Sequence, residues 1–296
     1  MLSIQNVTHT YPNGVQALKG VTLTIEKGMF GLLGPNGAGK SSLMRSIATL
    51  QQPTQGAVSF DGIDVLEEPM ALRRVLGYLP QDFGVYPRGS AYHLLDHLAV
   101  LKGFSDRRER KNIVDHLLAE TNLYGVRHKR VATFSGGMRR RFGIAQALIG
   151  DPKLIIVDEP TAGLDPEERN RFHNLLAEIG EDRVVLLSTH IIEDVTELCA
   201  SMAILAAGRV LVQGKPAELI QRLNGRVWTK HIDKSEKSRI EHAFHVISSH
   251  LFAGRTLVRV IAADRPGPDF DPAEANLADV YFSALKGEQS RARQAV

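Results

Sequence analysis

The first thirty residues alternate between apolar and polar positions. The segments "LSIQNVTHTY" and "ALKGVTLTIEKG" show this period of two on either side of a "PNG" turn, and they predict strands. Continuous apolar runs come later, in "MFGLLG", "KLIIVDEP" and "RVVLLSTH". Such runs are typical of strands that are buried on both faces of a parallel sheet. The pattern therefore predicts an antiparallel N-terminal unit followed by a layered core.

Apolar positions three and four residues apart predict helices between these strands. The segment from about Ser90 to Gly150 has this spacing in "AYHLLDHLAVLKGF" and "RKNIVDHLLAETNLYG", and so does the later segment "DPEERNRFHNLLAEIG". We expect a further strand in "RRVLGYLPQD" and a hairpin in "SMAILAAGRVLVQG". Alternating strands and helices predict an α/β fold on a mostly parallel sheet.

The composition changes near Asn224-Gly225. Beyond this point "RVWTKHI", "HVISSHLF" and "RTLVRVIA" predict strands, and "KSEKSRIEHAF" and "PAEANLADVYFSAL" predict helices. We expect a large domain over residues 1–220, with an inserted helical subdomain at about 85–150. A small α+β domain is expected over residues 221–296.

The overall charge is only mildly basic, with a net charge of +3 over 296 residues. This is too weak to indicate nucleic acid, and we expect the clusters "RRERK", "RHKR" and "RRR" to be solvated helix faces. The single cysteine, Cys199, excludes a disulfide within the chain, so we expect the chain to lie in a reducing compartment. We expect the Cys199 side chain to be buried. No apolar run reaches the roughly 18 residues of a membrane span. We therefore expect a cytoplasmic chain, with any transmembrane work done by another polypeptide.

The octapeptide "GPNGAGKS" fits the phosphate-loop pattern G-x-x-x-x-G-K-[ST] between a strand and a helix. Its glycines allow backbone N–H groups to surround phosphates, and Lys40 can place its ammonium on the β- and γ-phosphates. Ser41 can offer its hydroxyl to Mg²⁺, and Ser42 can reach the α-phosphate. The alternative is a chance glycine loop. The residues expected to bind the nucleotide are Gly34, Pro35, Asn36, Gly37, Ala38, Gly39, Lys40, Ser41 and Ser42.

The strand-like run "LIIVDEP" ends in two carboxylates, Asp158 and Glu159. An unpaired carboxylate is costly to bury, so this pair suggests a cation or a water molecule nearby. Asp158 suits a Mg²⁺ contact, directly or through water. Glu159 suits orienting, and deprotonating, an attacking water. The alternative is that Glu159 is a solvated strand end or caps the next helix.

The order of these motifs resembles that of the ATP-binding cassette (ABC) ATPases over roughly residues 1–215. "YLPQD" is similar to the family's Q-loop, with Gln81, and "FSGGM" to its signature motif, usually written LSGGQ. "AGLDP" resembles the D-loop, with Asp165, and "LSTH" the switch histidine, His190. Tyr11 lies where the family carries an aromatic residue that stacks on adenine. The resemblance implies a P-loop NTPase core that binds ATP and Mg²⁺.

The resemblance also implies that two subunits, expected to be copies of this chain, pair head to tail. Ser135, Gly136 and Gly137 of one subunit would then face the γ-phosphate bound by the other. Phe134 and Met138 replace the family's leucine and glutamine, and Met138 cannot make the hydrogen bonds of a glutamine.

The resemblance assigns roles to residues around the γ-phosphate. Glu159 would align the water, His190 would contact the γ-phosphate and help to hold that water, and Asp165 would link the two sites of the dimer. Gln81 would report nucleotide and metal to the helical subdomain. The residues expected to act in catalysis are Lys40, Gln81, Glu159 and His190. Those expected to hold Mg²⁺ are Ser41, Gln81 and Asp158.

A separate membrane permease is the partner that the resemblance implies. We expect it to dock near Gln81 and the segment "DFGVYPRGSAYHLLDHLAVLKGF", which would place the chain peripherally on the cytoplasmic face of the cell membrane. The tail "NLADVYFSAL" is similar to the end of cassettes that serve drug and lipid exporters, which favours export. An alternative is a cassette ATPase that acts on a macromolecular partner without transport. A third possibility, a module that binds ATP without turnover, is opposed by the presence of Glu159 and His190.

Overall fold

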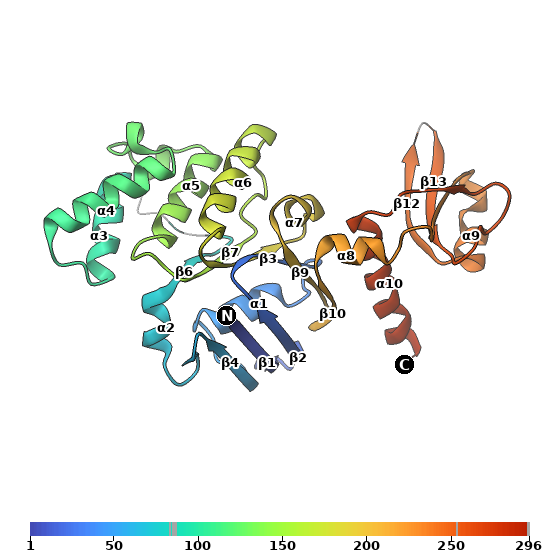
Figure 1. The fold of residues 1–296 in the computed structure, drawn as a ribbon, viewed down its shortest axis with the longest axis horizontal. Coiled ribbons are helices and arrows are strands. Elements are labelled where there is room, and N and C mark those ends of the chain that lie inside the picture. Colours follow the sequence, from blue (N-terminus) through green and yellow to red (C-terminus); the bar gives the residue numbers. More distant parts are fainter. Residues whose placement is uncertain (83, 85–87, 253, 295–296) are drawn as a thin grey trace.

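The computed structural model describes residues 1–82, 84, 88–252 and 254–294. Its central sheet has the strand order β10-β9-β3-β8-β7-β6 (Figure 1). The strands from β9 to β6 pair in parallel, and β9 and β10 form an antiparallel hairpin. The strands of this sheet are β3 (Gly28–Leu33), β6 (Leu76–Leu79), β7 (Leu154–Asp158), β8 (Val184–Thr189), β9 (Ser201–Ala206) and β10 (Arg209–Gly214).

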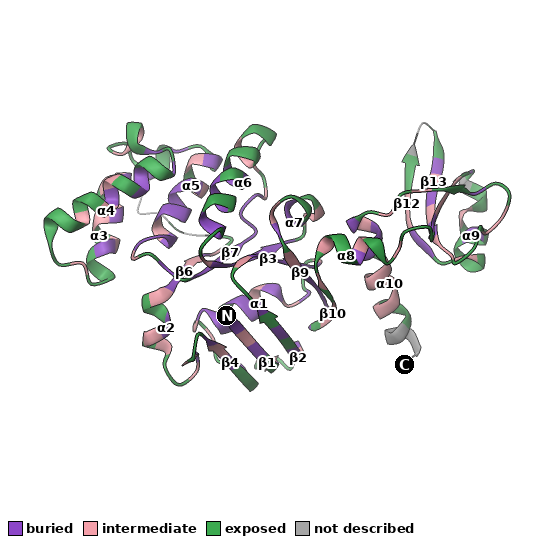
Figure 2. Ribbon diagram, viewed as in Figure 1, coloured by how far each residue is buried: buried purple, intermediate pink, exposed green. Residues whose placement is uncertain are grey.

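The alternating N-terminal segments form a separate antiparallel sheet with the order β2-β1-β4-β5. Its inward side chains share one hydrophobic core with helix α1 and with one face of the central sheet. The continuous apolar runs of β7 and β8 are buried along their whole length. Figure 2 shows buried residues in purple at the centre of the molecule, around β3 and β7. The strands of the N-terminal sheet are β1 (Leu2–Thr10), β2 (Gln16–Ile25), β4 (Gln55–Phe60) and β5 (Ile63–Asp64).

Helices α3, α4 and α5 form the helical part, and α5, α6 and α7 contribute to the core on the other face of the central sheet (Figure 1). Short 3₁₀ turns at Tyr124–Val126 and Val131–Thr133 connect α4 to α5. The α-helices up to this point in the fold are α1 (Lys40–Ile47), α2 (Pro69–Val75), α3 (Ala91–Leu101), α4 (Arg107–Glu120), α5 (Gly136–Ala147), α6 (Pro166–Gly180), α7 (Ile192–Leu198) and α8 (Pro216–Gln221).

One expected strand is shorter than the pattern suggested. Arg73, Arg74 and Val75 end helix α2, and the strand begins only at Leu76. Pro69 stands at the start of this helix, where its missing N–H group costs no hydrogen bond. The helix start therefore outweighs the strand preference of the residues that follow.

The C-terminal segment folds into an antiparallel sheet of order β12-β13-β11-β14, covered by α9 around a small apolar core. This sheet stands to one side of the molecule in Figure 1. Its elements are β11 (Val227–Ile232), a 3₁₀ turn (Lys234–Glu236), α9 (Lys237–Ala243), β12 (Val246–Phe252), β13 (Arg255–Ile261) and β14 (Asp271–Pro272).

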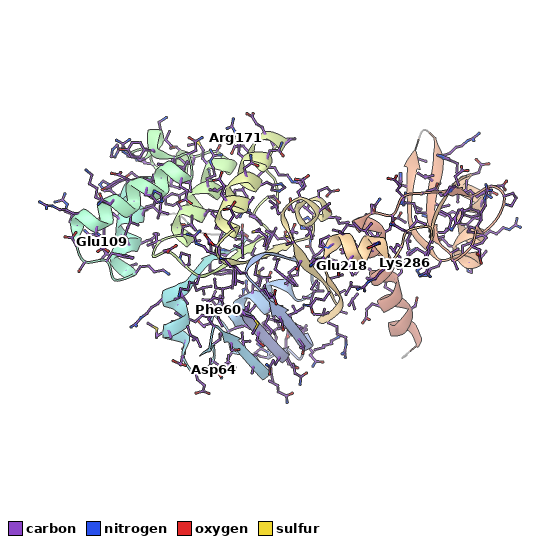
Figure 3. The ribbon with its side chains drawn as sticks, viewed as in Figure 1. Phe60, Asp64, Glu109, Arg171, Glu218 and Lys286 are labelled. Carbon is purple, nitrogen blue, oxygen red and sulfur yellow. The ribbon has the colours of Figure 1, made fainter. Side chains whose placement is uncertain are left out.

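The last helix, α10 (Leu277–Gln294), returns to the rest of the molecule. It contacts α8, β9 and β10, and its residues Leu277, Val280 and Tyr281 belong to the same apolar core as α5 and α6. Lys286 on this helix, labelled in Figure 3, donates a hydrogen bond to the carbonyl oxygen of Val246 on β12. The predicted α/β fold, with its antiparallel, helical and C-terminal α+β parts, is confirmed. The domain boundary at residue 220 stays a prediction.

In the part of the chain that the structure describes, no helix is both long enough and apolar enough to cross a bilayer.

Candidate functional site

The glycine loop lies between the end of β3 and the start of α1. Gly39 caps α1 in a left-handed conformation with φ of 107°, and no side chain caps the first N–H groups of the helix. A Cβ atom at Gly34 would lie 2.2 Å from the carbonyl oxygen of Leu205, so only glycine fits there. The uncapped N–H groups and the helix dipole make the start of α1 suitable for binding phosphates.

Lys40 is buried beneath this loop. Its Nζ donates hydrogen bonds to the carbonyl oxygens of Gly34 at 2.6 Å and Pro35 at 3.2 Å. Glu159 Oε1 lies 3.5 Å from the same Nζ. Burial lowers the pKa of Lys40, and the charge of Glu159 opposes that shift. The lysine is therefore a buried cation that the carbonyl oxygens of the loop hold in place.

Glu159 joins the loop to the switch histidine. Its Oε2 lies 3.0 Å from His190 Nδ1, and its backbone N–H donates to the carbonyl oxygen of Ser188 at 2.9 Å. Glu159 has a φ of 48°, an unusual value for a residue with a side chain, and it is only 8% exposed. The alternative of a solvated strand end does not hold for this glutamate.

Asp158 is the last residue of β7 and is buried. Its Oδ1 has no hydrogen-bond partner among the described residues. A buried carboxylate oxygen without a partner is an acceptor of the kind that Mg²⁺ or its water ligands require. The residue therefore fits the expected metal site.

The glycine loop, Lys40 and Glu159 line a cavity of about 690 Å³, a size suited to a small-molecule ligand, whereas Asp158 and His190 are not among its lining residues. The structure brings most of the expected site residues to its wall, including two that are distant in sequence, the expected nucleotide contact Tyr11 and the expected metal ligand Gln81. Of the residues expected in the site, those that line the cavity are Tyr11, Pro35, Asn36, Gly37, Ala38, Gly39, Lys40, Ser41, Ser42, Gln81 and Glu159.

Tyr11 is half-buried at this wall. Its hydroxyl lies 2.9 Å from Ser42 Oγ and donates to Gln51 Oε1 at 3.4 Å. Its ring meets the ring of His9 edge to face, with centroids 4.6 Å apart. These contacts fix the tyrosine against α1.

The signature segment lies elsewhere in the molecule. Ser135 caps α5 by accepting a hydrogen bond from the Met138 backbone N–H at 3.2 Å, and Ser135 and Gly136 are exposed. None of the described residues around the cavity belongs to this segment. Asp165 likewise caps the start of α6, where it accepts from the Glu168 backbone N–H at 2.9 Å.

The two departures from the family's signature are accommodated by packing. Phe134 is buried and meets Phe142 edge to face, with ring centroids 6.4 Å apart. Met138 packs against the same core as α5 and α6. An aromatic ring and a thioether thus fill space that the fold provides on the inner side of α5.

The arginines after the signature are not all solvated, contrary to expectation. Arg140 Nη1 donates to the carbonyl oxygen of Gln81 at 2.6 Å, which ties α5 to the Q-loop. Arg141 is buried and pairs with Glu168 of α6. The sequence "RRR" could not predict either of these partners, because Gln81 and Glu168 lie in distant parts of the sequence.

Comparisons with known proteins give a consistent family. The family model described as "ABC transporter" matches residues 18–162. ABC transporter ATP-binding protein NatA of Bacillus subtilis is 38% identical over 203 residues, covering 68% of this chain and 82% of that protein. Nod factor export ATP-binding protein I of Rhizobium meliloti is 36% identical over 231 residues, covering 76% and 67%.

Among solved structures, the fold is similar to the ATP-binding cassette MJ0796 in a dimeric post-hydrolysis state bound to ADP and Pi. That structure has a TM-score of 0.67 and 29% identity, and the match covers 73% of this chain and 98% of that one. The phosphate loop, Gln81 and Glu159 line one cavity, and the switch histidine contacts Glu159. With these features and relatives, this chain belongs to the ABC transporter family as an ATP-binding subunit that hydrolyses ATP.

Proposed function

We propose that the cavity beside α1 is the ATP site and that Glu159 orients the attacking water. The contact of Glu159 with both Lys40 and His190 carries this proposal, because it places a carboxylate between a buried cation and an imidazole. Lys40 binds the β- and γ-phosphates, whose oxygens replace the carbonyl oxygens of Gly34 and Pro35 as its acceptors. His190 helps to hold the water at the γ-phosphate.

Three side chains hold Mg²⁺ in this proposal, namely Ser41, Gln81 and Asp158. Ser41 and Gln81 line the cavity, and Asp158 offers a buried oxygen that has no partner among the described residues. The metal supplies positive charge that stabilises the phosphate oxygens. Arg140 donates a hydrogen bond to the backbone carbonyl of Gln81, so a movement of Gln81 would be passed to α5.

We place the second half of each site on a partner copy of this chain. Ser135, Gly136 and Gly137 lie outside the cavity of their own chain. Ser135 and Gly136 are exposed at the start of α5, whereas Gly137 is buried. A helix start of this kind attracts anions. A head-to-tail dimer brings it to the partner's γ-phosphate, with Asp165 at the contact, and the dimeric state of the similar MJ0796 structure supports this arrangement.

A groove of about 660 Å³ is the proposed docking place for the permease. It lies between α2, β6 and the end of α3, and overlaps the segment expected to dock. Met70 and Leu101 in its wall are 62% and 70% exposed, an apolar surface that suits a short helix of a membrane subunit. Residues 83 and 85–87 of the expected segment lie outside the described residues.

We propose that the transporter exports its substrate. The chain would lie peripherally on the cytoplasmic face of the membrane. The name of the similar Nod factor export protein supports this direction, and the family supports transport over action on another macromolecule.

Glu159→Gln in the full chain tests the central assignment. Loss of a general base costs about 10²- to 10⁴-fold, so hydrolysis should fall by that factor while ATP binding remains. Because ATP then persists in the composite site, the variant should form a stable dimer with ATP and Mg²⁺, measured by light scattering.

Glu167→Gln is the matched control, since Glu167 is exposed on α6 and pairs only with Arg171 among the described residues. It should hydrolyse ATP at the wild-type rate. Unchanged hydrolysis in Glu159→Gln would defeat the role assigned to Glu159. Hydrolysis without any ATP-dependent dimer would defeat the shared site.

A further inference from the structure

Asp194 is a carboxylate that the sequence analysis did not identify as a site residue. It lies in the first turn of α7 and is 0% exposed. Moving a carboxylate out of water without partners costs several kcal/mol, so its surroundings must compensate the charge. Those surroundings lead directly to the two loops that carry Glu159 and His190.

Asp194 Oδ2 accepts two hydroxyl hydrogen bonds. Thr161 Oγ1 donates at 2.6 Å and Thr189 Oγ1 at 3.0 Å, and both threonines are buried. Thr161 follows Glu159 by two residues in the loop after β7. Thr189 immediately precedes His190 at the end of β8. One carboxylate oxygen therefore joins the two loops.

Thr189 also fixes the turn that presents the histidine. Its Oγ1 accepts a hydrogen bond from the Ile191 backbone N–H at 2.9 Å while donating to Asp194. These two hydrogen bonds bracket His190 on both sides. The imidazole is thus held at the position where it meets Glu159 Oε2.

The other oxygen of Asp194 faces Arg169 and His173 on α6. Arg169 Nε donates to Oδ1 at 3.0 Å, and Arg169 Nη2 lies 2.8 Å from the same atom. His173 Nε2 lies 2.9 Å from Oδ1, and its Nδ1 lies 2.8 Å from Glu197 Oε2. Helices α6 and α7 contact each other over one side of the central sheet (Figure 1), so the network anchors both loops to this layer of packed helices.

We infer that Asp194 is a positioning residue for ATP hydrolysis, which holds Glu159 and His190 in register through Thr161 and Thr189. The inference rests on the proposed roles of Glu159 and His190. Asp194 touches neither nucleotide nor water in this role. Its loss lets the two loops shift relative to each other, which lowers the rate of the chemical step while the phosphate loop and its affinity for ATP persist.

Asp194→Asn keeps the size of the side chain and removes the charge. Its NH₂ group must face either the Arg169 guanidinium and the His173 ring or the two threonine hydroxyls, so the network cannot be fully satisfied. A displacement of about 1 Å at a catalytic group can cost about 10²-fold. We expect kcat to fall about 10- to 100-fold in the full chain, with KM for ATP within about two-fold of wild type.

Substitutions at the threonines separate positioning from general destabilisation. Thr189→Val and Thr161→Val remove the hydroxyls at nearly constant shape and should each lower kcat, whereas Thr189→Ser and Thr161→Ser retain the hydroxyls and should preserve it. Val195→Ala is the control, because Val195 is buried beside Asp194 and packs on the apolar core. It should lower the melting temperature and leave kcat unchanged below that temperature.

Wild-type kcat in Asp194→Asn overturns the inference, and so does an equal kcat loss in Val195→Ala or in the serine variants. If Asp194→Asn does not fold, the valine and serine variants decide, since a loss of kcat in valine that serine restores is the supporting result. Glu159→Gln separates this inference from the proposed function. Slow hydrolysis in that variant with normal kcat in Asp194→Asn refutes the positioning role alone, whereas wild-type hydrolysis in Glu159→Gln refutes the assignment on which it rests.

Discussion

Gly137 lies in the first turn of α5, where an added methyl group would collide with a buried ion pair. A Cβ atom there would lie 2.1 Å from Glu168 Oε2 and 2.6 Å from Glu168 Cδ. The carboxylate is not free to swing aside, because it pairs with Arg141 and Arg171. Gly137→Ala therefore forces Glu168 away from Arg141.

The cost follows from how deeply this pair lies. The side chains of Arg141 and Glu168 are 9% and 19% exposed. Removing one partner of a buried pair costs about 3–5 kcal/mol, and the helix preference of alanine over glycine returns about 1 kcal/mol. We expect Gly137→Ala to lower the free energy of unfolding by about 2–4 kcal/mol, measured by urea denaturation followed by circular dichroism.

Gly136→Ala provides the matched control, since no heavy atom lies within 4 Å of a Cβ built at Gly136. It should change the free energy of unfolding by less than about 1 kcal/mol. In a Glu168→Ala background the obstructing carboxylate is absent, and Gly137→Ala should no longer destabilise. Wild-type stability of Gly137→Ala, or an equal loss in both backgrounds, would refute the steric argument.

Two further predictions concern the docking groove and the cysteine. Leu101→Asp should abolish co-purification with the membrane subunit, whereas Leu251→Asp, at a residue that is 68% exposed on β12, should not; equal effects would exclude the groove as the docking place. Burial raises the pKa of Cys199 from 9.0 to about 12, so the thiol's contribution to stability is present below pH 9 and is lost as the pH rises toward about 12. The stability of wild type relative to Cys199→Ala should fall by about 1 kcal/mol between pH 8 and pH 10 in urea denaturation, and a constant difference would contradict the raised pKa.

The phosphate loop and the fold class were predictable because their signals are local. The eight residues from Gly34 to Ser41 and a strand ending in Asp158 specify their surroundings without information from distant segments. The period of the apolar positions likewise distinguished the strands from most helices. The structure added the common cavity that brings Tyr11 and Gln81 to the loop.

The supporting contacts were not predictable, because their partners are far apart in sequence. Arg140 bonds the carbonyl oxygen of Gln81 across 59 positions, and Asp194 reaches Thr161 across 33. An arginine in a basic run looks the same in sequence whether it faces solvent or a carbonyl group. An aspartate at the start of a helix likewise gives no sign that it is fully buried.

Helix α10 packs against the same apolar core as α5 and α6, and this limits how the chain can be shortened. A protein cut after residue 220 would lose Leu277, Val280 and Tyr281. The apolar surface that they cover on β9 and α8 would then be exposed to water and prone to aggregation. Along the sequence, the β11–β14 sheet is inserted between α8 and α10, and these two helices contact each other. Excising that sheet and splicing α8 to α10 would keep this apolar surface covered. We therefore expect a stable shortened chain to be discontinuous along the polypeptide.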